Sequence, residues 1–174
     1  MRLWILGDGD QREHLQQVAR ELSLPEDVAE NSAPGTIQFA GWLSQADCKV
    51  RLNAADCLVL PSLFECGGAV VLEAMALGKP VIATAWGGPL DYLDSECGIL
   101  VQPVSHDGLI DGLAAAMLEM ASSPERRRRM GACALAKIRS HYSWQGKVGQ
   151  MIAFYDAARR SGAPSERKGV VDRG

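Results

Sequence analysis

Short apolar runs alternate along the chain with segments whose apolar positions recur at helical spacing. Five of these runs predict β-strands: Arg2–Leu6, Thr36–Ala40, Asp56–Leu60, Pro80–Thr84 and Gly98–Val101. Strands that are apolar at nearly every position are typical of a parallel sheet covered by helices on both faces. The pattern therefore predicts an α/β fold with a parallel sheet as its core.

The intervening segments predict amphipathic or buried helices. In the first of them, Gln11–Leu22, the apolar positions follow i, i+3, i+4 and i+7, which is one face of an α-helix. The others are Ser44–Ala54 with Ser44 as N-cap, Gly68–Leu77 ending at a capping Gly78, an apolar face from Leu109 to Met120, Glu125–His141, and Lys147–Arg160. Right-handed crossovers between such units give a doubly wound, Rossmann-like sheet.

The length of 174 residues fits a single domain, which we expect to span residues 1–160. The segment Pro25–Gly35 is polar and reads as a loop. From residue 161 to 174 the composition shifts to Ser, Gly, Pro and charged residues. Such a composition buries too little apolar surface to fold, so we predict a disordered tail.

Composition narrows the classes of function. The net charge of −3, from 18 basic and 21 acidic residues, gives no electrostatic reason to expect nucleic acid as a partner. The five cysteines are odd in number and form no C-x-x-C pair, which favours a reduced, cytoplasmic compartment. No histidine lies at metal-ligand spacing, so we expect neither a metal nor another cofactor. The basic run Arg126–Arg129 leaves open a peripheral contact at the inner face of the membrane.

The segment from Ala55 to Asp91 carries the candidate chemistry. A predicted strand ends at Pro61, a short loop holds Glu65, and Gly67-Gly68 open a helix. In an open parallel sheet, ligands bind beyond the carboxyl ends of the strands, and a helix start offers unpaired N–H groups to anions. Two alternatives stay open: the glycines form only a tight turn, or Glu73, on that helix, is merely a solvated residue.

The same segment resembles a known family. Glu65 and Glu73 are separated by seven residues, as in the E-x7-E motif of the family 4 retaining glycosyltransferases, which have the glycosyltransferase B fold. The flanking matches follow in order: Ala55-Asp56, Pro61-Ser62, Glu73-Ala74-Met75-Ala76, Gly78-Lys79-Pro80, Gly87-Gly88, Gly98-Ile99-Leu100-Val101 and Tyr142-Ser143-Trp144. The resemblance extends from about Leu3 to Tyr155, and the ordered series is far more specific than the two glutamates alone.

The resemblance implies the C-terminal half of a two-domain enzyme, the half that binds a nucleoside-diphosphate sugar donor. By this likeness Glu65 is the catalytic-site residue, contacting the transferred sugar, and Glu73 holds the ribose. The donor's sugar and diphosphate would meet the backbone at Gly67, Gly68, Ala69 and Val70, and Gly41 and Trp42 would lie near the nucleobase. The family's chemistry retains the anomeric configuration, needs no bound metal and serves polysaccharide or glycolipid assembly.

The sequence departs from the family at its start. The family's first strand of this domain, and the basic pair that contacts the donor diphosphate, are not found before Arg2, and neither is the acceptor domain. We therefore expect weak donor binding and negligible transfer, with the other half supplied as an N-terminal acceptor domain or as a partner chain. The alternative is a non-catalytic module that binds a nucleotide or a protein partner. An epimerase or a phosphorylase of related fold is disfavoured by the motif order.

Overall fold

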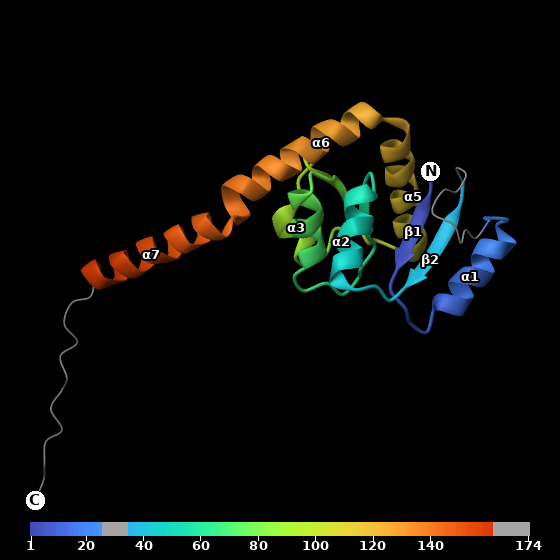
Figure 1. The fold of residues 1–174 in the computed structure, drawn as a ribbon, viewed down its shortest axis with the longest axis horizontal. Helices are drawn as coiled ribbons and strands as arrows, with labels where there is room; N and C mark the ends of the chain where they lie inside the picture. The colour runs from blue at the N-terminus through green and yellow to red at the C-terminus, as the bar shows by residue number, and fades with distance from the viewer. Residues whose placement is uncertain (26–34, 162–174) are drawn as a thin grey trace, which may run out of the picture. The chain divides into compact units, whose positions relative to one another are not determined.

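The structure, a computed structural model, describes residues 1–25 and 35–161 (Figure 1). It divides into two compact units, one from Met1 to Leu135 and one from Ala136 onward. The predicted loop Pro25–Gly35 and the predicted tail 161–174 fall almost entirely outside the described residues. The expectation of a single domain over residues 1–160 stays a prediction.

The strands of the first unit are parallel, as predicted, but they form two sheets. Strand β1 (Leu3–Leu6) pairs with β2 (Ile37–Gly41), whereas β3 (Leu58–Leu60), β4 (Val81–Thr84) and β5 (Gly98–Val101) form a second sheet in that order. The predicted α/β fold of parallel strands flanked by helices is confirmed, and among the described residues its strands divide between two sheets. Local apolar patterns predict strands, but they do not determine which strands become neighbours.

Helix α1 (Arg12–Glu21) covers the first sheet (Figure 1). Its Ala19 is buried against Ile37 and Phe39 of β2, with Leu3 and Ile5 of β1 packed around them. Helix α2 (Gln45–Ala54) follows β2 and starts where predicted, because the Ser44 hydroxyl accepts a hydrogen bond from the Asp47 N–H at 3.1 Å.

The main core lies on the second sheet. Ile82 of β4 and Val101 of β5 pack with Met120 of α5 (His106–Ser122) and Met130 of α6 (Pro124–Lys137). Helix α3 (Ala69–Ala76) buries Val71, Ala74 and Met75 completely and ends, as predicted, at Gly78, whose φ of +67° is left-handed. The short helix α4 (Pro89–Tyr92) was not predicted, because four residues are too few to show helical periodicity.

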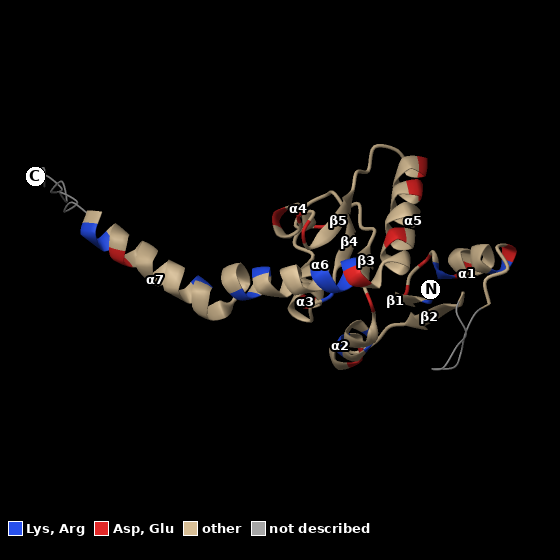
Figure 2. Ribbon diagram, turned by 90° about the horizontal axis from the view of Figure 1, so that it is seen from above, with Lys and Arg blue, Asp and Glu red and all other residues tan. Residues whose placement is uncertain are grey.

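Arg127 links α6 to its surroundings in this unit. Its guanidinium donates to the carbonyl oxygens of Met120 and, at 3.2 Å, Ala121 at the end of α5, and it lies 3.7 Å from the Asp56 carboxylate. A cation at a helix C-terminus pairs with carbonyl groups that have no helical partner. Figure 2 shows the acidic positions distributed along α5 and the basic positions of α6.

The second unit contains a π-helical turn (η1, Ile138–Tyr142) and α7 (Trp144–Ser161). The single helix predicted from Glu125 to His141 is thus interrupted after Lys137. The Lys147 ammonium lies over the Tyr142 ring at 5.5 Å from its centroid. No helix in the described part of the chain is long and apolar enough to cross a membrane.

Candidate donor site at the carboxyl ends of the strands

The loop between β3 and α3 folds around the Glu65 carboxylate. Its Oε1 atom accepts hydrogen bonds from the Gly68 N–H at 2.7 Å and the Gly67 N–H at 3.2 Å. Gly68 is the N-cap of α3 and has φ +62° and ψ +46°, a left-handed conformation that glycine adopts without steric cost. The side chain of Glu65 thus supplies a negative charge at the positive end of the helix dipole.

A second glycine loop packs directly on the first. A Cβ atom placed on Gly87 would lie 1.7 Å from the Glu65 carbonyl oxygen, and one on Gly88 would lie 2.2 Å from the Gly67 carbonyl oxygen. Gly87 also has a left-handed φ of +59°. No residue with a side chain fits at either position without movement of the loops. Gly87 and Gly88 therefore pack in direct contact with the backbone of the loop that carries Glu65.

The start of α3 leaves backbone donors available. Gly68 O accepts from the Val71 N–H at 2.8 Å, whereas no described hydrogen bond is donated by the amides of Ala69 and Val70. The first N–H groups of a helix have no intrahelical acceptor. Together with the dipole, they make this helix start suited to an anionic oxygen.

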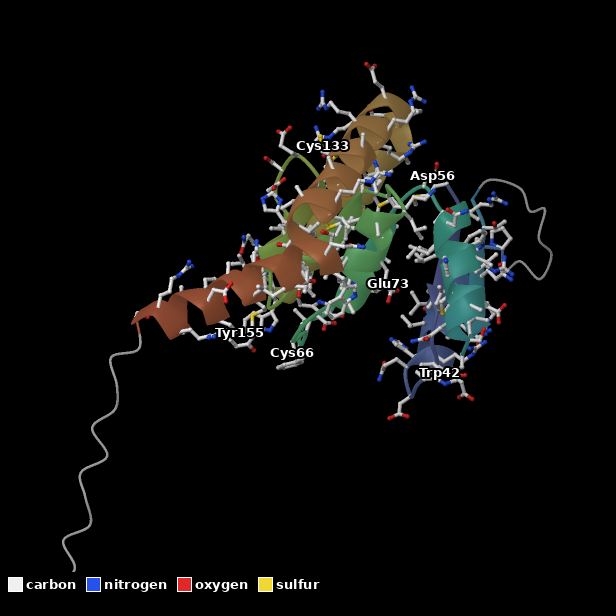
Figure 3. The ribbon with its side chains drawn as sticks, turned by 60° about the vertical axis from the view of Figure 1, so that its left-hand side comes forward. Trp42, Asp56, Cys66, Glu73, Cys133 and Tyr155 are labelled. Carbon is white, nitrogen blue, oxygen red and sulfur yellow. The ribbon has the colours of Figure 1, made fainter. Side chains whose placement is uncertain are left out.

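Glu73 lies on the second turn of α3, and its side chain is exposed (Figure 3). The apolar residues around Glu73 in the sequence favoured a carboxylate that contacts a ligand over one that is merely solvated. Among the described residues, the Glu73 carboxylate makes no hydrogen bond or ion pair. The physical reason is that α3 buries only the face with Val71, Ala74 and Met75. Glu73 and Glu65 do not contact each other among the described interactions: Glu65 lies in the loop before Gly67-Gly68, and Glu73 lies on the helix after them.

Gly41 is the last residue of β2 and Trp42 follows it, at the carboxyl end of this strand. Gly41 O accepts from the Gly7 N–H at 2.8 Å, which joins the two turns that follow β1 and β2. Trp42 is 85 % exposed and is seen apart from Cys66 and Glu73 in Figure 3. The described contacts do not bring Gly41 or Trp42 against Glu65.

Sequence reasoning missed Arg12 at this edge. Its guanidinium donates to the Phe39 carbonyl oxygen at 3.1 Å and lies 3.5 Å from the Asp8 carboxylate. The Asp8–Arg12 spacing of i, i+4 was the available signal. The Arg12 side chain lies beside the end of β2, since its Nη1 atom would lie 3.2 Å from a Cβ placed on Gly41.

Other features of the first unit lie away from these loops. A shallow pocket of about 300 Å³, lined by residues such as Asp94, Ile99 and Arg126, lies where β5 begins, at the opposite edge of the sheet from the Glu65 loop. Burial raises the pKa of the Cys57 thiol to about 11, which keeps it protonated and unreactive. Among residues 1–25 and 35–161 no group of three or more acidic, histidine or cysteine side chains could hold a metal ion.

These features define a Rossmann-like α/β domain in which the start of α3, with N–H groups suited to an anionic oxygen, lies at the carboxyl ends of the strands. The chain belongs to the family described as glycosyl transferases group 1, whose sequence pattern matches residues 1–137. The architecture is that of one half of the glycosyltransferase B fold. The chain is a glycosyltransferase domain by this relationship.

Individual relatives agree with the assignment. The chain is 34 % identical over 129 residues to the lipopolysaccharide core biosynthesis glycosyltransferase LpsE of Rhizobium meliloti, covering 74 % of this chain and 34 % of that protein. It superposes with a TM-score of 0.67 and 26 % identity on HepE of Anabaena, solved with UDP and glucose, covering 89 % of this chain and 40 % of that one.

One solved structure corresponds to nearly the same segment. It is the C-terminal domain of a glycosyl transferase group 1 family protein, LpcC, from Francisella tularensis, with 20 % identity and a TM-score of 0.63. The match covers 82 % of this chain and 86 % of that domain. By contrast, the chain spans about a third of the length of the curated relatives it matches.

Proposed function

We propose that this chain is the donor-binding domain of a retaining glycosyltransferase of family 4, which moves a sugar from a nucleoside-diphosphate sugar to an acceptor hydroxyl. The observation that carries the proposal is the start of α3, where backbone amides converge beside the Glu65 carboxylate. HepE, a relative at 26 % identity, was solved with UDP and glucose, which supports a donor of this chemical class.

The diphosphate is assigned to the helix start. The amides of Ala69 and Val70 are its donors, with those of Gly67 and Gly68 joining them if the Glu65 carboxylate swings away to meet the transferred sugar. The dipole contributes only about 0.3–1 kcal/mol per charge, so several N–H contacts must act together. Affinity for the diphosphate from this element alone is therefore modest.

The nucleoside is assigned to Glu73, Gly41 and Trp42. An exposed carboxylate on α3 can accept two hydrogen bonds from a ribose diol, as the acidic residue of dinucleotide-binding folds does. The exposed Trp42 ring offers a face on which a base can stack, worth about 1–3 kcal/mol. Gly41 lets the backbone turn toward that base, with φ +68°.

Transfer needs more than the described loops offer. Departure of a nucleoside diphosphate requires cations close to the growing negative charge, and water must be excluded from the sugar. No described arginine or lysine contacts the α3 start, and Arg12 is held by Asp8 and Phe39. We infer that residues 1–174 by themselves bind the donor weakly and transfer sugar negligibly, with an N-terminal acceptor domain or a partner chain supplying the remaining groups. We assign the enzyme to the cytoplasm, in peripheral contact with the membrane's inner face.

Calorimetric titration of the chain with UDP, GDP and ADP tests the donor assignment. We expect one of them to bind, with Glu73→Gln weakening that affinity at least about tenfold, since a hydrogen bond to a charged group contributes roughly 1.5–3 kcal/mol. Glu96→Gln is the matched control, because Glu96 is an exposed glutamate near the start of β5, away from the α3 loop.

The same titration followed by amide NMR locates the ligand. The Ala69 and Val70 resonances should shift most, together with those of Gly67 and Gly68. Millimolar nucleotide that leaves all four unmoved would exclude the donor site and favour a non-catalytic module that binds a protein partner.

A further inference from the structure

The turn that precedes β5 and the first turn of α6 border a shallow pocket in the first unit. Its volume is about 300 Å³, and it is lined by Asp94 and Ser95 of the turn, Gly98, Ile99 and Leu100 of β5, and Arg126 of α6. This volume is at the lower end of the range for small-molecule sites, about 300–1,000 Å³. The Glu65 loop follows the carboxyl end of β3, whereas the pocket lies where β5 begins, so it is not part of the candidate donor site.

The turn that borders the pocket is held in shape by its own hydrogen bonds. The Asp94 carbonyl oxygen accepts from the N–H groups of Cys97 at 3.1 Å and Gly98 at 3.0 Å, and the Asp94 carboxylate accepts from the Glu96 N–H at 3.0 Å. Cys97 is buried, and its Sγ atom accepts from the Asp94 N–H at 3.4 Å. Asp94 and Ser95 therefore carry their exposed side chains on a fixed backbone, which lowers the entropy cost of binding a ligand.

Arg126 brings a donor without an acceptor to the lining of the pocket. Its Nη1 atom lies 2.7 Å from the Glu119 carboxylate of α5, and its backbone N–H donates to Ser123 Oγ at 3.4 Å. Its Nε atom is buried and has no hydrogen-bond partner among residues 1–25 and 35–161. Buried donors nearly always have a partner, because a donor left without one loses its hydration and gains nothing in return. An acceptor oxygen on a bound molecule would remove this deficit and leave the pair with Glu119 intact.

The lining combines hydrogen-bond acceptors, donors and apolar carbon. Asp94 offers a carboxylate that accepts, Ser95 a hydroxyl that donates and accepts, and Arg126 a guanidinium that only donates. Ile99 and Leu100 are half-buried and add aliphatic surface. A sugar ring matches this combination, because its hydroxyls donate to a carboxylate and accept from a guanidinium while its C–H groups pack on aliphatic side chains.

The charges at the pocket disfavour an anionic ligand. Among the lining residues Arg126 is the one cation, and its guanidinium is already paired with Glu119. Asp94 adds a second carboxylate at the lining, and Glu96 is exposed in the same turn. A phosphate or sulfate would approach like charges with little to compensate their repulsion, whereas a neutral polyhydroxyl compound meets no such cost.

We propose that this pocket is a second sugar-binding site, which takes one neutral hexose or N-acetylhexosamine unit of a glycan. Asp94 and Ser95 accept hydrogen bonds from the sugar hydroxyls, and Arg126 donates to one of them. A glycan held there stays close to the enzyme while the start of α3 remains free, which raises its effective concentration. The proposal goes beyond the donor site and does not depend on nucleotide binding at α3.

Amide NMR titration of the chain with D-glucose, D-galactose, D-mannose and N-acetylglucosamine tests this assignment. We expect at least one of these sugars to shift the resonances of Ser95, Gly98 and Ile99, with a dissociation constant in the millimolar range, as a few hydrogen bonds to a small neutral ligand give. The amides of Ala69 and Val70 at the start of α3 should not respond to the sugar that shifts the pocket.

Three variants separate the pocket from the rest of the surface. Arg126→Gln should weaken sugar binding about tenfold, because it removes a charged donor. Ser95→Ala keeps the pair between Arg126 and Glu119, so it tests the pocket without disturbing α6, and it should weaken binding about threefold. Arg128→Gln is the matched control, since Arg128 is exposed on α6 and does not line the pocket.

Several results would overturn the proposal. One is that none of the four sugars moves the pocket resonances at high millimolar concentration. Another is that inorganic phosphate moves them and the sugars do not, which would make the pocket an anion site. Unchanged sugar affinity in both Arg126→Gln and Ser95→Ala would place the sugar elsewhere. A parallel titration with UDP keeps the two sites apart, because its failure would count against the donor site alone.

Discussion

Replacing Gly87 by alanine perturbs the contact between the two glycine loops. The new Cβ would lie 1.7 Å from the Glu65 carbonyl oxygen, a separation that no pair of atoms tolerates without movement of the backbone. The left-handed φ of +59° costs an alanine about 1–2 kcal/mol, and the forced shift adds roughly 1–3 kcal/mol. We expect Gly87→Ala to lower the free energy of unfolding by about 2–5 kcal/mol.

Two other glycines separate these contributions. Gly78 has φ +67° but its Cβ would meet nothing closer than 3.7 Å, so Gly78→Ala should show only the conformational cost of about 1–2 kcal/mol. Gly67 has neither a left-handed φ nor a neighbour within 4 Å of its Cβ, so Gly67→Ala should change stability by about 0.5 kcal/mol or less.

Urea unfolding followed by circular dichroism measures the series. With a slope of roughly 1–3 kcal/mol per molar urea, a loss of about 3 kcal/mol moves the midpoint by at least about 1 M. The expected order of stability is Gly67→Ala, then Gly78→Ala, then Gly87→Ala. Equal midpoints for the last two variants would refute the close packing of the Gly87 loop on the loop that carries Glu65.

Three further predictions concern single side chains. Glu65→Ala removes the acceptor of two backbone amides and should lower the free energy of unfolding, measured with urea, by about 1 kcal/mol. Glu65→Gln should recover part of this loss. Equal stability of the wild type and both variants would contradict the capping role of Glu65. Iodoacetamide at pH 8 should modify the exposed Cys66 and spare Cys57, whose pKa of about 11 leaves roughly one thiol in a thousand ionised, as peptide mass spectrometry would show. The Cys57 pKa is raised above its ordinary 9.0, so burial of the thiol stabilises the fold fully below pH 9 and this contribution is lost as pH rises toward 11. Arg127→Gln should lower the free energy of unfolding by about 1–3 kcal/mol, because the Met120 and Ala121 carbonyl oxygens and the Asp56 carboxylate lose their donor. Arg128→Gln, at an exposed position, is the control and should leave stability unchanged. An Arg127→Gln variant as stable as the wild type would refute the capping of α5 by Arg127.

The sequence by itself determined the local elements. Strand β5 was predicted with its observed bounds, and the start of α2 at Ser44 and the end of α3 at Gly78 were predicted from capping chemistry. These features depend on residues close together in the chain, so a periodic pattern or a single cap is enough to specify them. The loop holding Glu65 and the helix start at Gly68 belong to the same class, because the carboxylate binds amides two and three residues away.

The tertiary structure alone decided which of these elements meet. Gly87 and Gly88, which follow β4, pack against the Glu65 loop, which follows β3. Nothing in the sequence around these two glycines distinguishes them from the glycines of an ordinary turn. The same holds for the exposure of Glu73, which depends on the face that α3 buries. The division of the strands into two sheets has a similar origin: a strand's own sequence specifies its conformation, whereas its neighbours are chosen by the energy of burying apolar faces and pairing edges across the whole fold.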